Sequence, residues 1–106
     1  MIPRISLIPT FTVKPDVDGT DITQYMDEPD LFFRRIVQYV MNRIEGIETE
    51  SILCYIIQDT NNKLHRSTFV LEKEGWHKSL DKALEYFAKI EEYETCELIK
   101  QLKETI

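Results

Sequence analysis

The side chains best able to bind a metal ion or act as a nucleophile are two cysteines and two histidines, namely Cys54, His65, His77 and Cys96. Structural zinc sites usually bring their ligands in close pairs, because each pair closes a tight knuckle of chain. These four residues are widely separated and form no such pair. The spacing therefore predicts no metal site, with His65 on a strand face and His77 on the surface.

A nucleophile with a neighbouring base is the other chemistry that these residues suggest. Ser67 or Cys54 would be the nucleophile, and His65 or His77 the base. No glycine-rich elbow surrounds either candidate nucleophile, and Cys54 lies in an apolar segment that disfavours its thiolate. We therefore expect no catalytic residue, no cofactor and no small-molecule substrate.

Two groups of carboxylates also resemble functional sites in composition. Asp16, Asp18 and Asp21 lie beside Gly19, as in a calcium-binding loop. The register that aligns this glycine loses the first ligand, so a plain turn explains the segment better. The acidic run at 91–94 falls at a predicted helix corner, where carboxylates are usually solvated. A chain of this size rarely builds the deep pocket that an acid pair needs for catalysis.

Composition and charge restrict the class of protein further. With 106 residues, 42% of them hydrophobic and 30% charged, the chain is expected to form one folded domain. Its net charge is −6, and its longest basic run is Arg34-Arg35. Because nucleic-acid binding relies on clustered Lys and Arg, we expect no direct contact with nucleic acid.

The cysteines and the N-terminal residues indicate an intracellular protein. Small secreted domains usually carry several bridged cysteines, so Cys54 and Cys96 are predicted to be buried free thiols in a reducing cytoplasm. The first residues lack the apolar run and cleavage site of a signal peptide. No segment approaches the roughly 18 apolar residues of a membrane span. We expect a cytoplasmic location, or the virion if the protein is viral.

Residues 1–28 form a different kind of chain from the rest, because they contain three of the four prolines. Their apolar residues alternate with polar ones, which is typical of an extended arm or edge strand. Such an arm adds a strand either to its own sheet or to that of a partner. Residues 29–106 are predicted to form a single α+β domain. The apolar residues of this alternation are Ile5, Leu7, Phe11 and Val13.

The middle of the chain predicts a helix followed by a β-hairpin. Asp27-Glu-Pro-Asp30 is a helix start, and the helix is expected to run to about Ile44 and stop at Gly46. The segment 51–58 is apolar on both alternating faces, which predicts a central strand covered on both sides by helices or by another molecule. A turn at 59–63 and a second strand at 64–73 complete the hairpin.

The C-terminal part predicts a helical hairpin. Ser79 is the expected cap of the first helix, with Leu80, Ala83, Leu84 and Phe87 as its apolar stripe. From Ile90 onward the apolar residues repeat every three positions, which gives no common face on one straight helix. A break near Glu91-Glu92 restores two usable stripes. The full element order is thus β-α-β-β-α-α.

The stretch 84–102 resembles the UVR motif, a short helical hairpin found in excision-repair nuclease subunits and in some adaptors of bacterial protein quality control. Tyr93-Glu94 stands where the motif has its aromatic–glutamate pair, and Cys96 and Ile99 occupy its small-residue and leucine positions. Lys100-Gln101 departs from the Arg-Asp that the motif prefers. The resemblance covers about a quarter of the chain and implies a hairpin that packs against another protein.

These observations lead to one main hypothesis and two alternatives. The leading one is a non-enzymatic accessory or assembly subunit of a larger complex, such as a viral (phage) structural component, with another protein or a second copy as partner. The first alternative is an acidic inhibitor that occupies a basic nucleic-acid-binding surface of its target, and the second is a small enzyme. Trp76 is interpreted first as a core residue and second as an interface anchor. The interface candidates are Ile5, Leu7, Phe11, Val13, Trp76 and Tyr93.

Overall fold

The computed structural model describes residues 8–13, 27–60 and 63–106. Its elements, in chain order, are β1 (Thr10–Val13), α1 (Pro29–Ile44), β2 (Ile52–Thr60), β3 (Lys63–Val70), the short 3-10 turn η2 (Lys73–Gly75), α2 (Trp76–Lys89) and α3 (Tyr93–Thr105). This order confirms the predicted β-α-β-β-α-α class.

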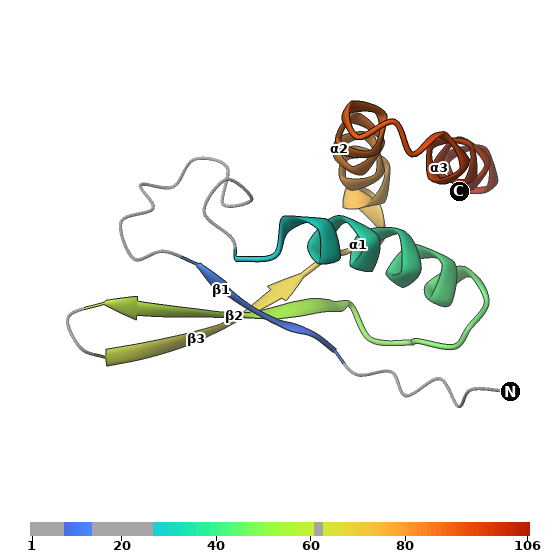
Figure 1. Ribbon diagram of the computed structural model, residues 1–106. Coiled ribbons are helices and arrows are strands. Elements are labelled where there is room, and N and C mark those ends of the chain that lie inside the picture. Colours follow the sequence, from blue (N-terminus) through green and yellow to red (C-terminus); the bar gives the residue numbers. More distant parts are fainter. Residues whose placement is uncertain (1–7, 14–26, 61–62) are drawn as a thin grey trace, which may run out of the picture.

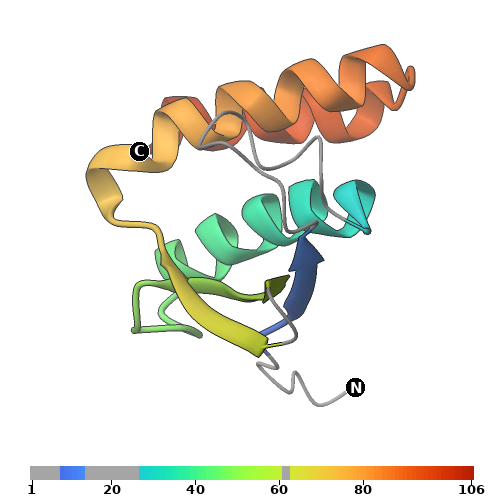
Figure 2. The ribbon, with the colours of Figure 1, turned by 90° about the vertical axis from the view of Figure 1, so that its left-hand side faces the viewer.

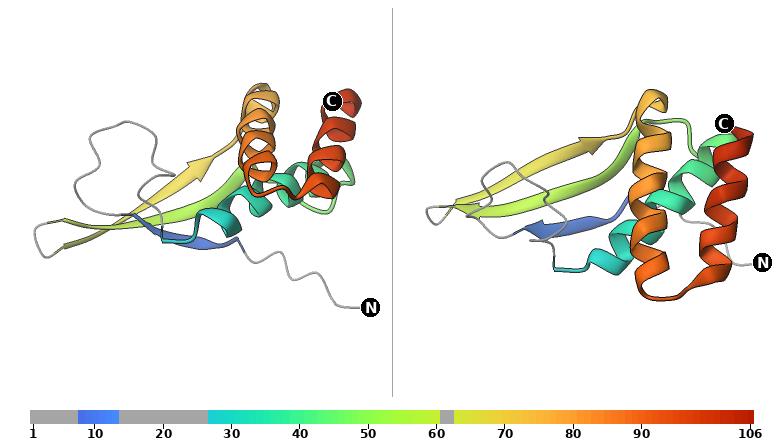
Figure 3. Two further views of the ribbon diagram at one scale, coloured as in Figure 1. Left: turned by 45° about the horizontal axis from the view of Figure 1, so that its top comes forward. Right: turned by 90° about the horizontal axis from the view of Figure 1, so that it is seen from above.

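The elements form three layers (Figures 1 and 2). The sheet has the strand order β1-β2-β3, in which β2 is parallel to β1 and antiparallel to β3. Helix α1 lies on one face of this sheet, and α2 and α3 lie on the far side of α1. The β2–β3 hairpin extends past the helices at its turn end (Figure 3).

Helix α1 is the middle layer, and its sequence fits that place. Pro29 occupies the first turn, Asp30 lies at the positive end of the helix dipole, and Gly46 follows the last turn with a φ of 76°. The predicted start, end and stop of this helix are therefore confirmed. Because α1 is covered from both sides, its apolar residues are buried around much of its circumference: Phe32, Phe33, Ile36, Val37, Tyr39 and Val40.

Strand β1 is part of the chain's own core. It pairs with β2 over Thr10–Val13, and Phe11 and Val13 are both buried. The ring of Phe11 meets that of Phe32 edge to face, with centroids 5.6 Å apart. This part of the N-terminal arm thus adds a strand to its own sheet. Ile5 and Leu7 lie outside the described residues.

Strand β2 contains an irregularity that explains its unusual burial. The register with β3 shifts between Ile52 and Cys54, so one extra residue is accommodated there. As a result Leu53 and Cys54, although consecutive, are both buried against the helices. The described helices cover only this face of the sheet (Figure 2). Of the two covers expected for β2, helices or another molecule, helices are therefore present on one face, and the cover of the other face stays a prediction.

Helix α2 begins earlier than the sequence suggested. The sequence predicts Ser79 as its cap, but the helix starts at Trp76, directly after the η2 turn. The reason is packing: Trp76, Leu80, Ala83 and Phe87 form one buried stripe at helical spacing. Starting at Ser79 would have left the indole outside that stripe.

The predicted helical hairpin is confirmed, with its corner near Glu91-Glu92. Helices α2 and α3 run side by side in opposite directions (Figure 3, right). No glycine is present at the corner, and Glu91 itself adopts a left-handed backbone conformation with a φ of 61°. In α3 the buried residues are Cys96, Ile99 and Leu102, whereas Ile90 and Tyr93 at the corner are exposed.

Candidate functional site

The interface candidates from the sequence separate into buried and exposed residues. Phe11, Val13 and Trp76 belong to the core. The indole of Trp76 meets the ring of Tyr39 edge to face at 6.4 Å, and the guanidinium of Arg43 lies 5.7 Å from the indole. These three residues therefore cannot serve as surface anchors of the folded chain, and for Trp76 the core interpretation holds. Tyr93 is 66% exposed.

The residues considered for chemistry also lie apart from one another. His65 is exposed on β3 and His77 is exposed on α2. Cys54 and Cys96 are buried free thiols, and burial raises the pKa of Cys54 to about 11. Across residues 8–13, 27–60 and 63–106, no three His, Cys, Asp or Glu side chains are grouped as metal ligands would be.

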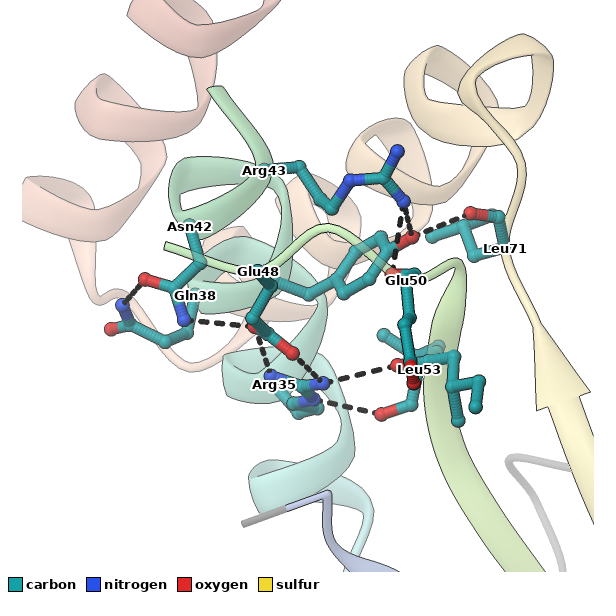
Figure 4. Close-up of polar contacts among 10 residues, drawn as sticks. Arg35, Gln38, Asn42, Arg43, Glu48, Glu50, Leu53 and Leu71 are labelled. Carbon is teal, nitrogen blue, oxygen red and sulfur yellow. Dashed lines mark hydrogen bonds and ion pairs between the residues drawn. The ribbon is translucent and has the colours of Figure 1, made fainter. Parts of the chain in front are cut away.

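The most extensive polar network lies on the inner face of the sheet, between α1 and β2 (Figure 4). Arg35 and Glu48 form an ion pair at 2.8 Å, and their side chains are only 9% and 8% exposed. Arg35 also donates to the backbone oxygens of Leu53 at 2.7 Å and Ile52 at 3.2 Å. Those carbonyls border the irregularity in β2, where the strand ladder is interrupted. The buried arginine therefore satisfies the acceptors around the bulge.

Glu48 neutralises this arginine and is itself held by hydrogen bonds. Asn42 donates to its carboxylate at 2.9 Å. Burial alone would raise the pKa of Glu48, but the hydrogen bonds from Arg35 and Asn42 outweigh burial and hold that pKa below its ordinary value. Glu48 is therefore ionised at neutral pH, as a charged partner for Arg35 requires.

A second branch of the network joins α1 to the ends of β2 and β3. The hydroxyl of Tyr39 donates to the backbone oxygen of Leu71 at 2.8 Å. Arg43 donates to that hydroxyl at 2.9 Å and to the backbone oxygen of Glu50 at 3.0 Å (Figure 4). These bonds serve backbone groups of the fold itself, so the inner face is a structural region.

Another ion-pair group fastens the corner of the helical hairpin to the start of α1. Arg34 bonds to Glu92 at 2.6 Å and to Asp30 at 2.6 Å, and the hydroxyl of Tyr86 donates to Asp30 at 2.8 Å. The hydrogen bonds from Arg34 and Thr95 lower the pKa of Glu92 to about 2. The bonds from Arg34 and Tyr86 likewise lower the pKa of Asp30. This group also has a structural role.

The opposite face of the sheet, called here the outer face, is the surface that the described helices leave uncovered (Figures 1 and 2). Leu64 is 74% exposed and Val70 is 49% exposed. The guanidinium of Arg66 lies over the ring of Tyr55 at 4.4 Å. From the strand registers, the outer face includes Thr10, Thr12, Ile52, Tyr55, Ile57, Leu64, Arg66, Thr68 and Val70.

The two edges of the sheet also differ, because described residues bond to one edge and not to the other. At the β1 edge, Thr12 donates its N–H to the carboxylate of Asp27 at 3.2 Å and accepts the N–H of Asp27 at 3.1 Å. The chain therefore occupies part of that edge itself. At the β3 edge, by contrast, the described residues place no backbone group against the strand, and the side chains of Lys63–Thr68 are all exposed.

The hydrogen-bond pattern identifies the backbone groups at the β3 edge. Tyr55 donates its N–H to Pro9 on the β1 side, so the Tyr55–Thr68 pair is not hydrogen-bonded. Bonded and non-bonded pairs alternate in an antiparallel ladder, and the N–H and C=O groups of Leu64, Arg66 and Thr68 therefore point away from β2. The same three residues carry outer-face side chains, so backbone and side chains together present one surface.

The sequence predicts the apolar β2 segment but not the outer face. Which β2 side chains lie on that face depends on the register shift at Leu53 and on which face of the sheet receives α1. Comparison with models of known protein families, with curated proteins and with solved structures gives no match to this chain. The likeness to the UVR motif therefore stays a prediction. No helix in the described part of the chain is long and apolar enough to cross a membrane.

Proposed function

We propose that this chain is a non-enzymatic accessory or assembly subunit that works by protein–protein contact through the outer face of its sheet. The observation that carries the proposal is the exposure of Leu64 and Val70 on a sheet face that no described helix covers. A sheet normally buries at least one apolar face, and here the inner face already fills that role. Leu64 and Val70 lie near opposite ends of β3, and the half-buried Tyr55 and Ile57 lie between them in the register. Apolar side chains thus extend along this second face, as is typical of a contact surface.

The neighbouring residues of the outer face support the same function. Tyr55, with Arg66 stacked on its ring, combines the two residue types that most often dominate binding energy at interfaces. Ile57 lies beside them and is half-buried. The polar networks of the inner face and of the hairpin corner are engaged in holding the fold together. The outer face is thus the surface with the best anchors for a partner.

Affinity capture from the cells that make this chain tests the proposal. The bait would be the full chain, either unchanged or with Leu64→Ser and Val70→Ser together. Leu31→Ser is the matched control, because Leu31 on α1 is 49% exposed, as is Val70. We expect a protein enriched by the unchanged chain and by Leu31→Ser, and lost with the outer-face variant. No enrichment over the bare support, or equal enrichment by all three baits, would contradict the proposal.

A further inference from the structure

No described residue pairs with the edge of β3 that points away from β2, and this edge is called here the free edge. On the basis of the proposed function, it allows the chemistry of the partner to be specified. An exposed strand edge with outward N–H and C=O groups is a template for an added strand. Here those groups belong to Leu64, Arg66 and Thr68. The other edge is partly occupied, since Asp27 bonds to both backbone groups of Thr12. An added strand is therefore expected to pair with the edge of β3 and not with the edge of β1.

The charge of β3 is opposite to that of the chain. The whole chain carries a net charge of −6, whereas β3 contains Lys63 and Arg66 and no acidic residue. A strand added to this edge places its side chains directly opposite these two cations. Opposite charges in such cross-strand pairs are favourable, and like charges are unfavourable. The edge therefore selects a strand that carries carboxylates.

The same charges disfavour a second copy of this chain as the occupant. If two β3 strands paired with each other, Lys63 and Arg66 of both copies would gather on one short edge. Lysine on an edge strand is a common device against self-pairing. A single-stranded nucleic acid is also disfavoured, because two cations on one strand provide few phosphate contacts. Neither objection applies to an acidic protein segment, because its carboxylates attract both cations.

We infer that the free edge of β3 binds an extended acidic segment of a partner protein as an added strand. Its carboxylates lie opposite Arg66 on the outer face and opposite Lys63 on the inner face. Its remaining outer-face residues are β-branched or apolar, because they lie opposite Leu64, Thr68 and Val70. The added strand extends the outer face of the sheet and buries part of the exposed Leu64 and Val70.

Selection from a displayed library of random peptides tests the inference with no partner in hand. The bait is the full chain, and each random segment has the length of β3, 8 residues. We expect enriched peptides to alternate Asp or Glu with Val, Ile or Thr. No enrichment, or enrichment of basic or uncharged peptides, would overturn the inference.

Titration of one enriched peptide against variants then locates the contact. Thr68→Pro removes an outward N–H without removing a bond to β2, and it should weaken binding by about tenfold or more. Lys63→Glu with Arg66→Glu should weaken it by about tenfold through side chains alone, so the test does not depend on the proline variant folding. Lys100→Glu on α3 is the charge control, expected to stay within about twofold. Unchanged binding by the charge-reversal pair would overturn the inference.

Two further outcomes separate this inference from the proposed function. If affinity capture depends on Leu64 and Val70 but tolerates Thr68→Pro and the charge reversals, the outer face binds a partner and the added strand is wrong. If the unchanged chain captures nothing, the proposed function itself fails.

A dimer in sedimentation analysis that is lost with Thr68→Pro would identify a second copy as the occupant. Tighter binding of single-stranded RNA than of the selected peptide would identify nucleic acid. Either result would overturn the inference that the edge of β3 binds an acidic strand.

Discussion

The inner and outer faces of the sheet treat arginine in opposite ways. On the inner face, Arg35 is nearly buried and is paired with Glu48 and with two backbone carbonyls of β2. On the outer face, Arg66 is exposed and lies over the ring of Tyr55. A buried guanidinium must find partners inside the fold, because desolvation is too costly otherwise. An exposed one has no such requirement and remains available for a partner molecule.

The comparison separates residues that maintain the fold from residues that can contact a partner. Substitutions on the inner face are expected to lower the free energy of unfolding. Substitutions on the outer face are expected to change binding at nearly constant stability. Three measurements examine this difference, and a fourth concerns the ion pairs at the hairpin corner.

The largest effect is expected for Glu48→Gln. The substitution keeps the shape of the side chain but leaves Arg35 as a buried charge without a counterion. Loss of one partner of a buried pair costs about 4 kcal/mol of unfolding free energy. Urea denaturation measures it, with Glu85→Gln as control, because Glu85 forms an exposed pair with Lys89. The control should change stability by less than about 0.5 kcal/mol. Similar losses for both variants would contradict a structural role specific to the buried pair.

The second effect compares an inner-face aliphatic residue with an outer-face one. Leu53→Ala removes a buried side chain beside the β2 irregularity, and we expect a loss of about 3 kcal/mol. Val70→Ala shortens a half-exposed side chain and should cost less than about 1 kcal/mol. Thermal unfolding of the two variants measures the difference. Equal losses would mean that the outer face is packed against something in the isolated chain.

A smaller effect concerns acid stability at the hairpin corner. The folded-state pKa of Glu92 is about 2, below its ordinary value of 4.5. The stability that the contact with Arg34 contributes is therefore fully present above pH 4.5 and is lost as the pH falls through about 2. We expect Glu92→Gln to flatten the fall in stability over this range. Urea denaturation between these pH values compares this variant with the unchanged chain. Parallel curves for Glu92→Gln and the unchanged chain would contradict the assignment.

The smallest effect on stability is expected for Leu64→Ser. Leu64 is 74% exposed, so its replacement should alter unfolding free energy by less than about 0.5 kcal/mol. Under the proposed function the same substitution weakens partner capture. Differential scanning calorimetry and capture from the same preparation measure both quantities. A loss of stability comparable to that of Leu53→Ala would remove the distinction between the two faces.

Local sequence signals predicted most of the fold. Proline in the first turn and Gly46 after the last defined α1, and the change of spacing after Ile90 defined the hairpin corner. The start of α2 differs from the prediction, because a serine at position 79 favours a helix cap there, whereas the helix begins at Trp76. Trp76 lies four positions before Leu80 and so already belonged to the apolar stripe, which was the signal available.

The candidate site was less predictable, because it depends on long-range geometry. Arg34 and Arg35 are neighbours in the sequence, but Arg34 pairs with Asp30 and Glu92 whereas Arg35 is buried against Glu48. Asp30 lies four residues before Arg34 on the same helix, so that pair could be read from the sequence. The contact of Arg34 with Glu92 and the burial of Arg35 against Glu48 could not, because these partners come from other parts of the fold. The open outer face likewise depends on the side of the sheet that receives α1.

Amide hydrogen exchange along β3 tests most directly whether the outer face and its edge are the contact surface. In the free chain, the amides of Leu64, Arg66 and Thr68 should exchange quickly, while those of the alternate residues His65, Ser67 and Phe69 are protected by β2. In complex with the captured partner, the first three should become protected as well. If they continue to exchange quickly while protection appears around Tyr93 at the hairpin corner, the contact surface is the helical hairpin and the account is wrong.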